Sequence, residues 1–265
     1  MRSERTAIRS QGRSHPKDIF PFTRRSMLVL ASFLCLLVFF LTACGGSDSS
    51  SAPDAKQLIK DAQAAILRVT SYHFKLVTTN VGTEAKLPIV SAEGDIVVPE
   101  KLKANANALL LGNIVQVQII AIGDQQYILL FGAWQETTGL LDPRTLSDPQ
   151  KGVASILGHI QNPTTPTDSS VGGRPCWQIN GKLDPTYLAG ITGGGAPAGS
   201  TDDITSCIGK TDNLPYQIII KGPAATGDTD KTVRTFTLSN FDENVTIEAP
   251  IAPASTPVLT PSVTP

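Results

Sequence analysis

Cys44 is the residue whose surroundings predict the most specific chemistry in this sequence. It ends the tetrapeptide Leu41-Thr42-Ala43-Cys44, which closes an uncharged, largely apolar run from Met27 to Leu41 behind the basic pair Arg24-Arg25. Small residues before a cysteine at the end of such a run are typical of a bacterial lipoprotein signal. In such signals the thiol receives a diacylglyceryl group, and a peptidase then cuts before the cysteine.

The apolar run itself separates two interpretations of this leader. It is about 15 residues long, whereas a membrane-spanning helix needs roughly 20. The alternative, an uncleaved membrane anchor, is therefore disfavoured. Two or three acyl chains on Cys44 would hold the mature protein on the outer face of the cell membrane, since a single chain binds a membrane only marginally. The arginine pair partly resembles a twin-arginine export signal, and the general secretory route stays open beside it.

The other cysteines predict a disulfide. Cys35 is lost with the leader, which leaves Cys176 and Cys207 as one pair in an oxidising compartment. Their spacing is not that of a zinc site or a redox motif. We expect a Cys176–Cys207 disulfide, with two buried free thiols as the alternative.

The remaining polar residues show no catalytic pattern. The mature chain has two histidines, His73 and His159, and neither stands beside a second ligand type at a metal-binding spacing. Nucleophile elbows, zinc-binding helices and phosphate-binding glycine loops are missing from the sequence. Glu93 and Asp95 come nearest to a carboxylate pair, but two such residues on one strand face are typical of a solvated surface. We therefore expect neither an enzyme nor a bound cofactor or metal.

Length and charge limit the possible partners. The leader, residues 1–43, holds seven basic and two acidic residues, so the mature 222 residues carry 15 basic and 21 acidic ones, a net charge near −6. This balance argues against nucleic acid and against electrostatic docking on anionic lipid. We expect a lipidated Gly/Ser tether over 44–53, one folded domain over 54–250 and a disordered Pro/Thr tail over 251–265.

Hydrophobic periodicity predicts an α+β domain. Apolar residues recur at helical spacing after Asp54, and a second helix is expected to start at Asp148-Pro149, with a helical turn over 184–189. The expected strands cover residues 72–79, 91–98, 102–111, 114–122, 125–131, 174–182, 205–210, 215–221, 232–240 and 244–249. Because the links between neighbouring strands are short, these nine or ten strands should run antiparallel.

Two of these strands have an unusually small apolar face. Ala104, Ala106 and Ala108 alternate with polar residues, and the next strand places Val115, Val117 and Ile119 on one face. A sheet face built this way either lets a helix pack very close or leaves room for a guest molecule. The alternation alone does not choose between these two outcomes.

The order of several short motifs resembles the LppX/LprAFG family of actinobacterial lipoproteins. After the lipobox cysteine and the tether, the motifs are Thr70-Ser71-Tyr72-His73-Phe74, Ala92-Glu93-Gly94-Asp95-Ile96, Gly132-Ala133-Trp134, Asp148-Pro149-Gln150-Lys151-Gly152-Val153, Leu214-Pro215-Tyr216-Gln217 and Leu238-Ser239-Asn240-Phe241-Asp242. The resemblance implies a strongly curved antiparallel half-barrel whose concave face, covered by helices, encloses an apolar cavity, similar to carrier folds of the LolA type. Its members carry acylated glycolipids or triacylglycerides through the cell envelope.

The resemblance and the alternation together predict a lipid-binding cavity. Its expected lining is Ala104, Ala106, Ala108, Val115, Val117, Ile119, Ile156, Leu157, Ile218 and Ile220. The glycine-rich stretch 190–203 lacks residues that could fix it, so we expect a mobile flap at the mouth. A 16-carbon chain would contribute a gross transfer energy of about 12 kcal/mol before ordering costs.

The expected partners are a lipid or acylated glycolipid and, through Cys44, the membrane. An envelope transporter is a further candidate partner. The alternative function is a non-enzymatic structural or interaction lipoprotein that presents its sheet to an envelope protein.

The lipobox yields the first testable prediction. The substitution Cys44→Ala removes the thiol that would be acylated, so the precursor should stay uncut and carry no lipid. Labelling cells with a tagged fatty acid measures this, and label retained by the variant would contradict the prediction.

Overall fold

The first helix and its cap follow the sequence pattern closely. The computed structural model describes residues 51–82, 88–139 and 142–250, so Cys44, the leader and the tail lie outside the described residues. Helix α2 (Ala55–Ile66) starts after Asp54, whose side chain accepts a hydrogen bond of 2.9 Å from the Gln57 amide. This satisfies one of the free N–H groups of the first turn. One face of the helix is buried, as its period predicts.

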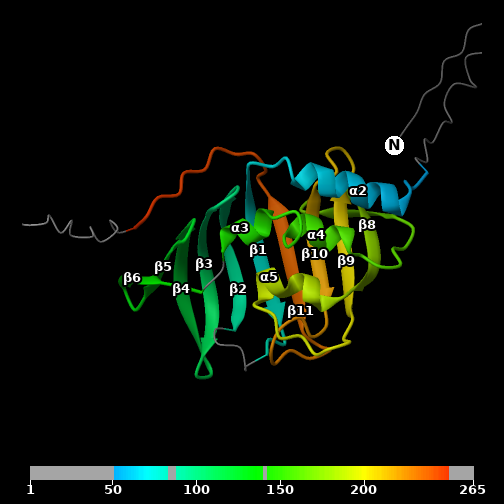
Figure 1. Ribbon diagram of the computed structural model, residues 1–265. Helices are drawn as coiled ribbons and strands as arrows, with labels where there is room; N and C mark the ends of the chain where they lie inside the picture. The colour runs from blue at the N-terminus through cyan, green and yellow to red at the C-terminus, as the bar shows by residue number, and fades with distance from the viewer. Residues whose placement is uncertain (1–50, 83–87, 140–141, 251–265) are drawn as a thin grey trace, which may run out of the picture. The chain divides into compact units, whose positions relative to one another are not determined.

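All described strands join one antiparallel sheet, so the predicted α+β class is confirmed (Figure 1). Its strands are β1 (Ser71–Thr79), β2 (Ile89–Val97), β3 (Lys101–Leu110), β4 (Asn113–Ile122), β5 (Gln125–Leu130), β6 (Ala133–Thr137), β7 (Thr167–Val171), β8 (Arg174–Leu183), β9 (Asp202–Gly209), β10 (Pro215–Lys221) and β11 (Val233–Ser239). The order across the sheet is β6-β5-β4-β3-β2-β1-β11-β10-β9-β8-β7. Two meanders therefore meet where the first strand pairs with the last.

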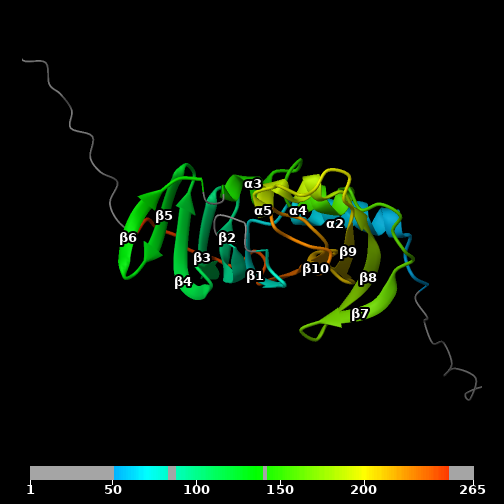
Figure 2. The same cartoon turned by 90° about the horizontal axis from the view of Figure 1, so that it is seen from below.

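The helices lie along one face of the curved sheet (Figure 2). Besides α2 these are α3 (Pro143–Ser147), α4 (Val153–Gly158), the 3₁₀ turn η1 (Pro185–Leu188) and α5 (Ala189–Thr192). The second helix is not as predicted, because Asp148-Pro149 follows α3 instead of starting α4. Gly152 lets the chain turn tightly between them, since a Cβ there would lie 2.1 Å from the Leu146 carbonyl oxygen.

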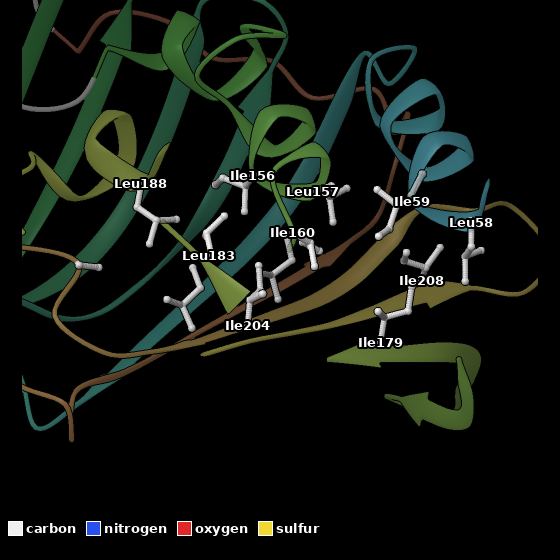
Figure 3. Close-up of a cluster of buried hydrophobic side chains, with 14 residues drawn as sticks. Leu58, Ile59, Ile156, Leu157, Ile160, Ile179, Leu183, Leu188, Ile204 and Ile208 are labelled. Carbon is white, nitrogen blue, oxygen red and sulfur yellow. The ribbon is translucent and has the colours of Figure 1, made fainter. Parts of the chain in front are cut away.

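Leu58 and Ile59 of α2, together with Ile156 and Leu157 of α4, form the main core against β8 to β10 (Figure 3). The two helices are also joined by a hydrogen bond of 3.0 Å from the Gln63 side chain to the Ala154 carbonyl. The α2–α4 layer is therefore packed tightly onto one half of the sheet.

Two strands were not predicted, and one predicted strand is wrong. β6 and β7 are short and polar and form the two edges of the sheet, where no alternating apolar pattern is required. The segment 244–249 alternates like a strand but joins no ladder. Instead it packs Ile247 against Ile120 and Tyr127, on the sheet face opposite the helices. Its alternation reflects packing on a sheet face, not strand pairing.

The predicted disulfide is confirmed. Cys176 and Cys207 are bonded, with their Cα atoms 5.6 Å apart. They lie diagonally across the neighbouring strands β8 and β9, two rungs apart in the ladder, because Cys176 pairs with Gly209 and Cys207 pairs with Gln178. The bond closes a separation of 31 residues, which would stabilise the fold by roughly 3 to 4 kcal/mol.

The buried side chain of Ile247 gives a prediction for the C-terminal segment. Ile247→Ala should lower the free energy of unfolding by about 2 to 5 kcal/mol, because it removes a side chain that is 2% exposed. Thr246→Ala, at an exposed neighbouring position, is the matched control and should change stability by less than about 0.5 kcal/mol. Urea unfolding measures both, and equal effects would show that the segment is not docked.

Candidate site: an apolar cavity under the helices

A small cavity lies between the centre of the sheet and the helices. Its volume is about 60 Å³. Its lining is entirely apolar apart from the hydroxyl end of one tyrosine: Tyr72, Phe74, Ile96, Leu146, Val153, Ile156, Ile191, Ile218, Ile220, Phe236 and Leu238. The cavity thus sits where β1, β2, β10 and β11 face α3, α4 and α5.

Strand register explains why these side chains converge. Phe74 of β1 stands opposite Leu238 of β11, and Phe236 stands opposite Ile218 of β10. Side chains directly opposite each other share a face, and residues two apart on one strand share it as well. The β1–β11 pairing therefore places two aromatic rings in the floor of the cavity.

The structure brings only part of the predicted lining to this cavity. Ile156, Ile218 and Ile220 line it, whereas Leu157 is buried in the neighbouring core with α2. The six residues predicted on the third and fourth strands share the helix-facing side of the sheet but lie outside the cavity lining: Ala104, Ala106, Ala108, Val115, Val117 and Ile119.

Those six residues form a continuous stripe of small side chains. Register pairs Ala104 with Ile119, Ala106 with Val117, and Ala108 with Val115. The three alanines and Val117 are buried, whereas Val115 and Ile119 are partly exposed. A lipid-binding role for this stripe stays a prediction.

The aromatic lining was missed by sequence reasoning. Tyr72 and Phe74 alternate in a predicted strand, and so do Phe236 and Leu238, so a period-two signal was present at both places. Nothing in either pattern shows that the two strands are neighbours, because some 160 residues separate them.

The size of the cavity decides what it can hold in this conformation. A volume of 60 Å³ corresponds to about two water molecules. Pockets for drug-sized ligands are roughly 300 to 1,000 Å³. An acyl chain therefore requires that the cavity widen. The sheet side is held by ladder hydrogen bonds, and α4 is packed into the main core. α3 and α5 span only five and four residues and bury few side chains, so we expect the cavity to widen by movement of these two helices.

The glycine-rich stretch after α5 is tied more firmly than predicted. Ile191 lines the cavity, and the Thr192 hydroxyl donates to the Ala224 carbonyl at 2.9 Å. The Gly194 carbonyl accepts from the Thr226 amide at 3.2 Å. The expectation that nothing fixes this stretch is thus wrong for its first residues. Its movement as a flap stays a prediction.

Charged groups lie on the same face of the sheet, beyond the apolar lining. Arg234 stands opposite Ile220 and makes two hydrogen bonds to Asp228, at 2.6 and 3.0 Å. Asp202 is fully buried, and its carboxylate oxygens have no hydrogen-bond partner within the described part of the chain. Burial raises the pKa of Asp202 to about 6, against the opposing effect of Arg234. The interior therefore changes from apolar to polar along the strands.

The histidine and carboxylates noted in the sequence lie on the other face. His73 Nδ1 is 2.7 Å from Asp95, and its Nε2 is 3.3 Å from Glu93. The hydrogen bond from His73 and the charge of Lys75 lower the pKa of the Glu93 carboxyl. These residues border a groove of about 540 Å³ next to Val245, whose lining mixes polar and apolar side chains. Within the described ranges no group of His, Cys, Asp or Glu could hold a metal ion.

Comparison with known proteins identifies the architecture. The sequence profile of the LppX_LprAFG lipoprotein family matches residues 54–247. The chain belongs to this family. The domain resembles the crystal structures of LprF from Mycobacterium bovis (TM-score 0.61, 22% identity, 76% of this chain and 100% of that one) and of LppX from Mycobacterium tuberculosis (0.55, 20%, 74% and 99%). These structures share its fold.

Two curated relatives have names that state a cargo. LprF of Mycobacterium bovis, named as a proposed transporter of diacylated glycolipids, is 25% identical over 79% of this chain and 82% of its own. The lipoarabinomannan carrier protein LprG of Mycobacterium leprae is 25% identical over 86% and 96%. Both relatives are named as carriers or transporters, and neither is named as an enzyme. In residues 51–82, 88–139 and 142–250 no helix is long and apolar enough to cross a bilayer.

Asp202 yields a prediction on pH dependence. Its pKa is near 6 in the folded protein and about 3.9 when unfolded, so the wild type loses stability as pH rises from about 4 to 6. Asp202→Asn cannot ionise and should be more stable by roughly 2 to 3 kcal/mol at pH 7, with little difference at pH 4. Urea unfolding across this range tests it. The exposed neighbour variant Asp203→Asn is the control, and a gain of the same size there would contradict the prediction.

Proposed function

We propose that this protein is an extracytoplasmic lipid carrier that binds acyl chains between its sheet and its short helices. The observation that carries the proposal is the apolar cavity formed by β1, β2, β10 and β11 under α3, α4 and α5, in a member of a lipoprotein family whose named relatives carry glycolipids. The cargo we propose is a lipid or acylated glycolipid.

Binding would rely on shape and burial, not on specific polar contacts. Each CH₂ group moved from water into an apolar site contributes about 0.8 kcal/mol. A long acyl chain would therefore provide enough free energy to displace α3 and α5, which bury few side chains. Aliphatic and aromatic walls select chain volume, and the polar region around Arg234 and Asp228 lies where a headgroup would meet the end of the cavity.

The carrier would act while held at the membrane. Cys44, with its lipobox, is the proposed site of lipidation, and residues 44–53 would form a tether with a reach of roughly 15 to 20 Å. The signal peptide over 1–43 and the tail over 251–265 complete this proposed organisation.

The small volume of the cavity favours a second candidate function. A cavity of 60 Å³ and a groove of about 540 Å³ with a mixed polar and apolar lining also suit an interaction lipoprotein that presents its sheet to an envelope protein. The two functions differ in one measurable property, the lipid content of the purified protein.

Native mass spectrometry of the chain without its leader and without acylation, purified from a lipid-containing host, tests the carrier. Ile218→Trp places a larger side chain in the cavity and should lower the lipid-bound fraction at least fivefold. Ile219→Trp is the matched control, because its side chain points to the other face of β10 and should leave lipid binding unchanged. Wild-type protein free of lipid would instead support the interaction lipoprotein.

Two further variants show how far an opened cavity extends. Ala106→Phe and Val117→Phe fill the stripe of small residues on β3 and β4. If the bound chain reaches this stripe, both should lower lipid loading with the melting temperature nearly unchanged. A stability loss of about 1 to 3 kcal/mol with unchanged lipid would show that these side chains are ordinary core.

A further inference from the structure

Two hairpin turns at one end of the sheet expose large apolar side chains. Leu111 in the β3–β4 turn is 95% exposed, and Phe131 in the β5–β6 turn is 83% exposed. Because β4 and β5 run antiparallel, with Gln118 opposite Leu129, both turns lie beyond this rung at the same end. The β3–β4 turn is at the lower end of the sheet in Figure 1. Ile114, which is 65% exposed, adds to this apolar end.

The backbone at both turns is unfavourable for the residues that occupy them. Leu111 and Gly112 have φ values of 51° and 81°, and Phe131 and Gly132 have 51° and 82°. Two positive φ values define a type I′ turn, in which the first position normally holds Asn, Asp or Gly. A bulky apolar residue in this conformation is strained and here gains no burial in return. Folding stability therefore does not explain either side chain.

The other two-residue hairpin turns differ in composition. Gly123-Asp124 joins β4 to β5 at the opposite end, and Gly172-Gly173 joins β7 to β8. Neither exposes an apolar side chain. An exposed hydrophobic residue is thus a property of the two turns at one end and not of hairpins in this sheet generally.

The flanks of both turns are free of charge. Asp, Glu, Lys and Arg are absent between Lys103 and Asp124, and again between Asp124 and Glu136. Trp134, partly buried, follows the second turn. Exposed Leu and Phe beside Trp and uncharged amides match the boundary between lipid headgroups and acyl chains. Within these two stretches no charged side chain is available to form ion pairs with a protein partner.

We propose that the β3–β4 and β5–β6 turns form a membrane-docking edge whose Leu111 and Phe131 side chains insert into the interface of a phospholipid bilayer. A carrier would use this edge where lipid is taken up or released. The mature chain is acidic, so attraction to anionic lipid does not drive this contact, and insertion should be insensitive to salt. Docking does not require that the cavity open, so its failure is distinct from failure of the carrier function.

Vesicle binding tests the docking edge. The described residues between 51 and 250 form one compact unit with its own core, so the chain can be tested without leader or acylation. The double variant Leu111→Asn/Phe131→Asn should bind phosphatidylcholine vesicles at least about tenfold more weakly than the wild type. Asn tolerates positive φ, so the melting temperature should be unchanged or higher. Leu67→Asn, at an exposed apolar position on the C-terminal end of α2, is the control and should bind normally.

A spectroscopic variant locates the contact. In Phe131→Trp, the fluorescence of the new indole should shift to the blue on vesicle addition and be quenched by lipids brominated on their acyl chains. Normal vesicle binding by the double variant, or no binding by the wild type, would overturn the proposal. Binding confined to anionic vesicles and lost at high salt would overturn it too. So would a double variant that loses self-association and keeps vesicle binding, since the turns would then be a protein interface.

Discussion

The pairing of the first strand with the last is the interaction on which the rest of the structure depends. β1 and β11 form seven residue pairs, from His73↔Ser239 to Thr79↔Val233. The chain between β1 and β11 is long, and bringing its two ends together costs conformational entropy. This cost grows only slowly with the length of the chain segment, and the ladder of backbone hydrogen bonds offsets it. Without this pair the two meanders would share no edge, and the cavity floor would not exist.

Both ends of the β1–β11 seam are secured by side chains. At one end the Thr70 amide and hydroxyl donate to Asp242, and the Ser71 hydroxyl donates to the Glu243 carbonyl. At the other end the Thr232 hydroxyl donates to the Asn80 carbonyl, and the Asn80 side chain donates to the Lys231 carbonyl. Polar residues just outside the strands thus hold the register that aligns the aromatic floor of the cavity.

The two faces of the sheet are covered in different ways, with consequences for motion. On one half, α2 and α4 pack onto large aliphatic side chains and are held in the main core. On the other half, the segment 244–249 covers β4 and β5 from the opposite face through Ile247. Gly94 lets β2 and β3 approach closely, because a Cβ there would meet the Lys103 carbonyl. The short helices α3 and α5 bury few side chains, so we expect them to move more easily than α2 and α4.

Several elements of this fold could be predicted from short stretches of the sequence. Asp54 and the helical spacing after it predicted the first helix, and the short links between strands predicted antiparallel pairing. The two cysteines left after the leader is removed predicted the Cys176–Cys207 bond. Each of these predictions depends on neighbouring residues or on a simple count. The sequence also predicts lipidation of Cys44 and a tether over 44–53, and the family resemblance implies a carrier. Lipidation and the tether stay predictions, because Cys44 lies outside the described residues.

Long-range packing decided the rest. Alternation in 244–249 could not separate a paired strand from a segment lying on a sheet face, because both bury every second side chain. The ten predicted lining residues divided between a cavity, a core and a separate stripe, since register between distant strands sets which side chains meet. Sequence determined what each face is made of. Only the β1–β11 pairing, formed between residues far apart in the chain, decided where those faces enclose a space.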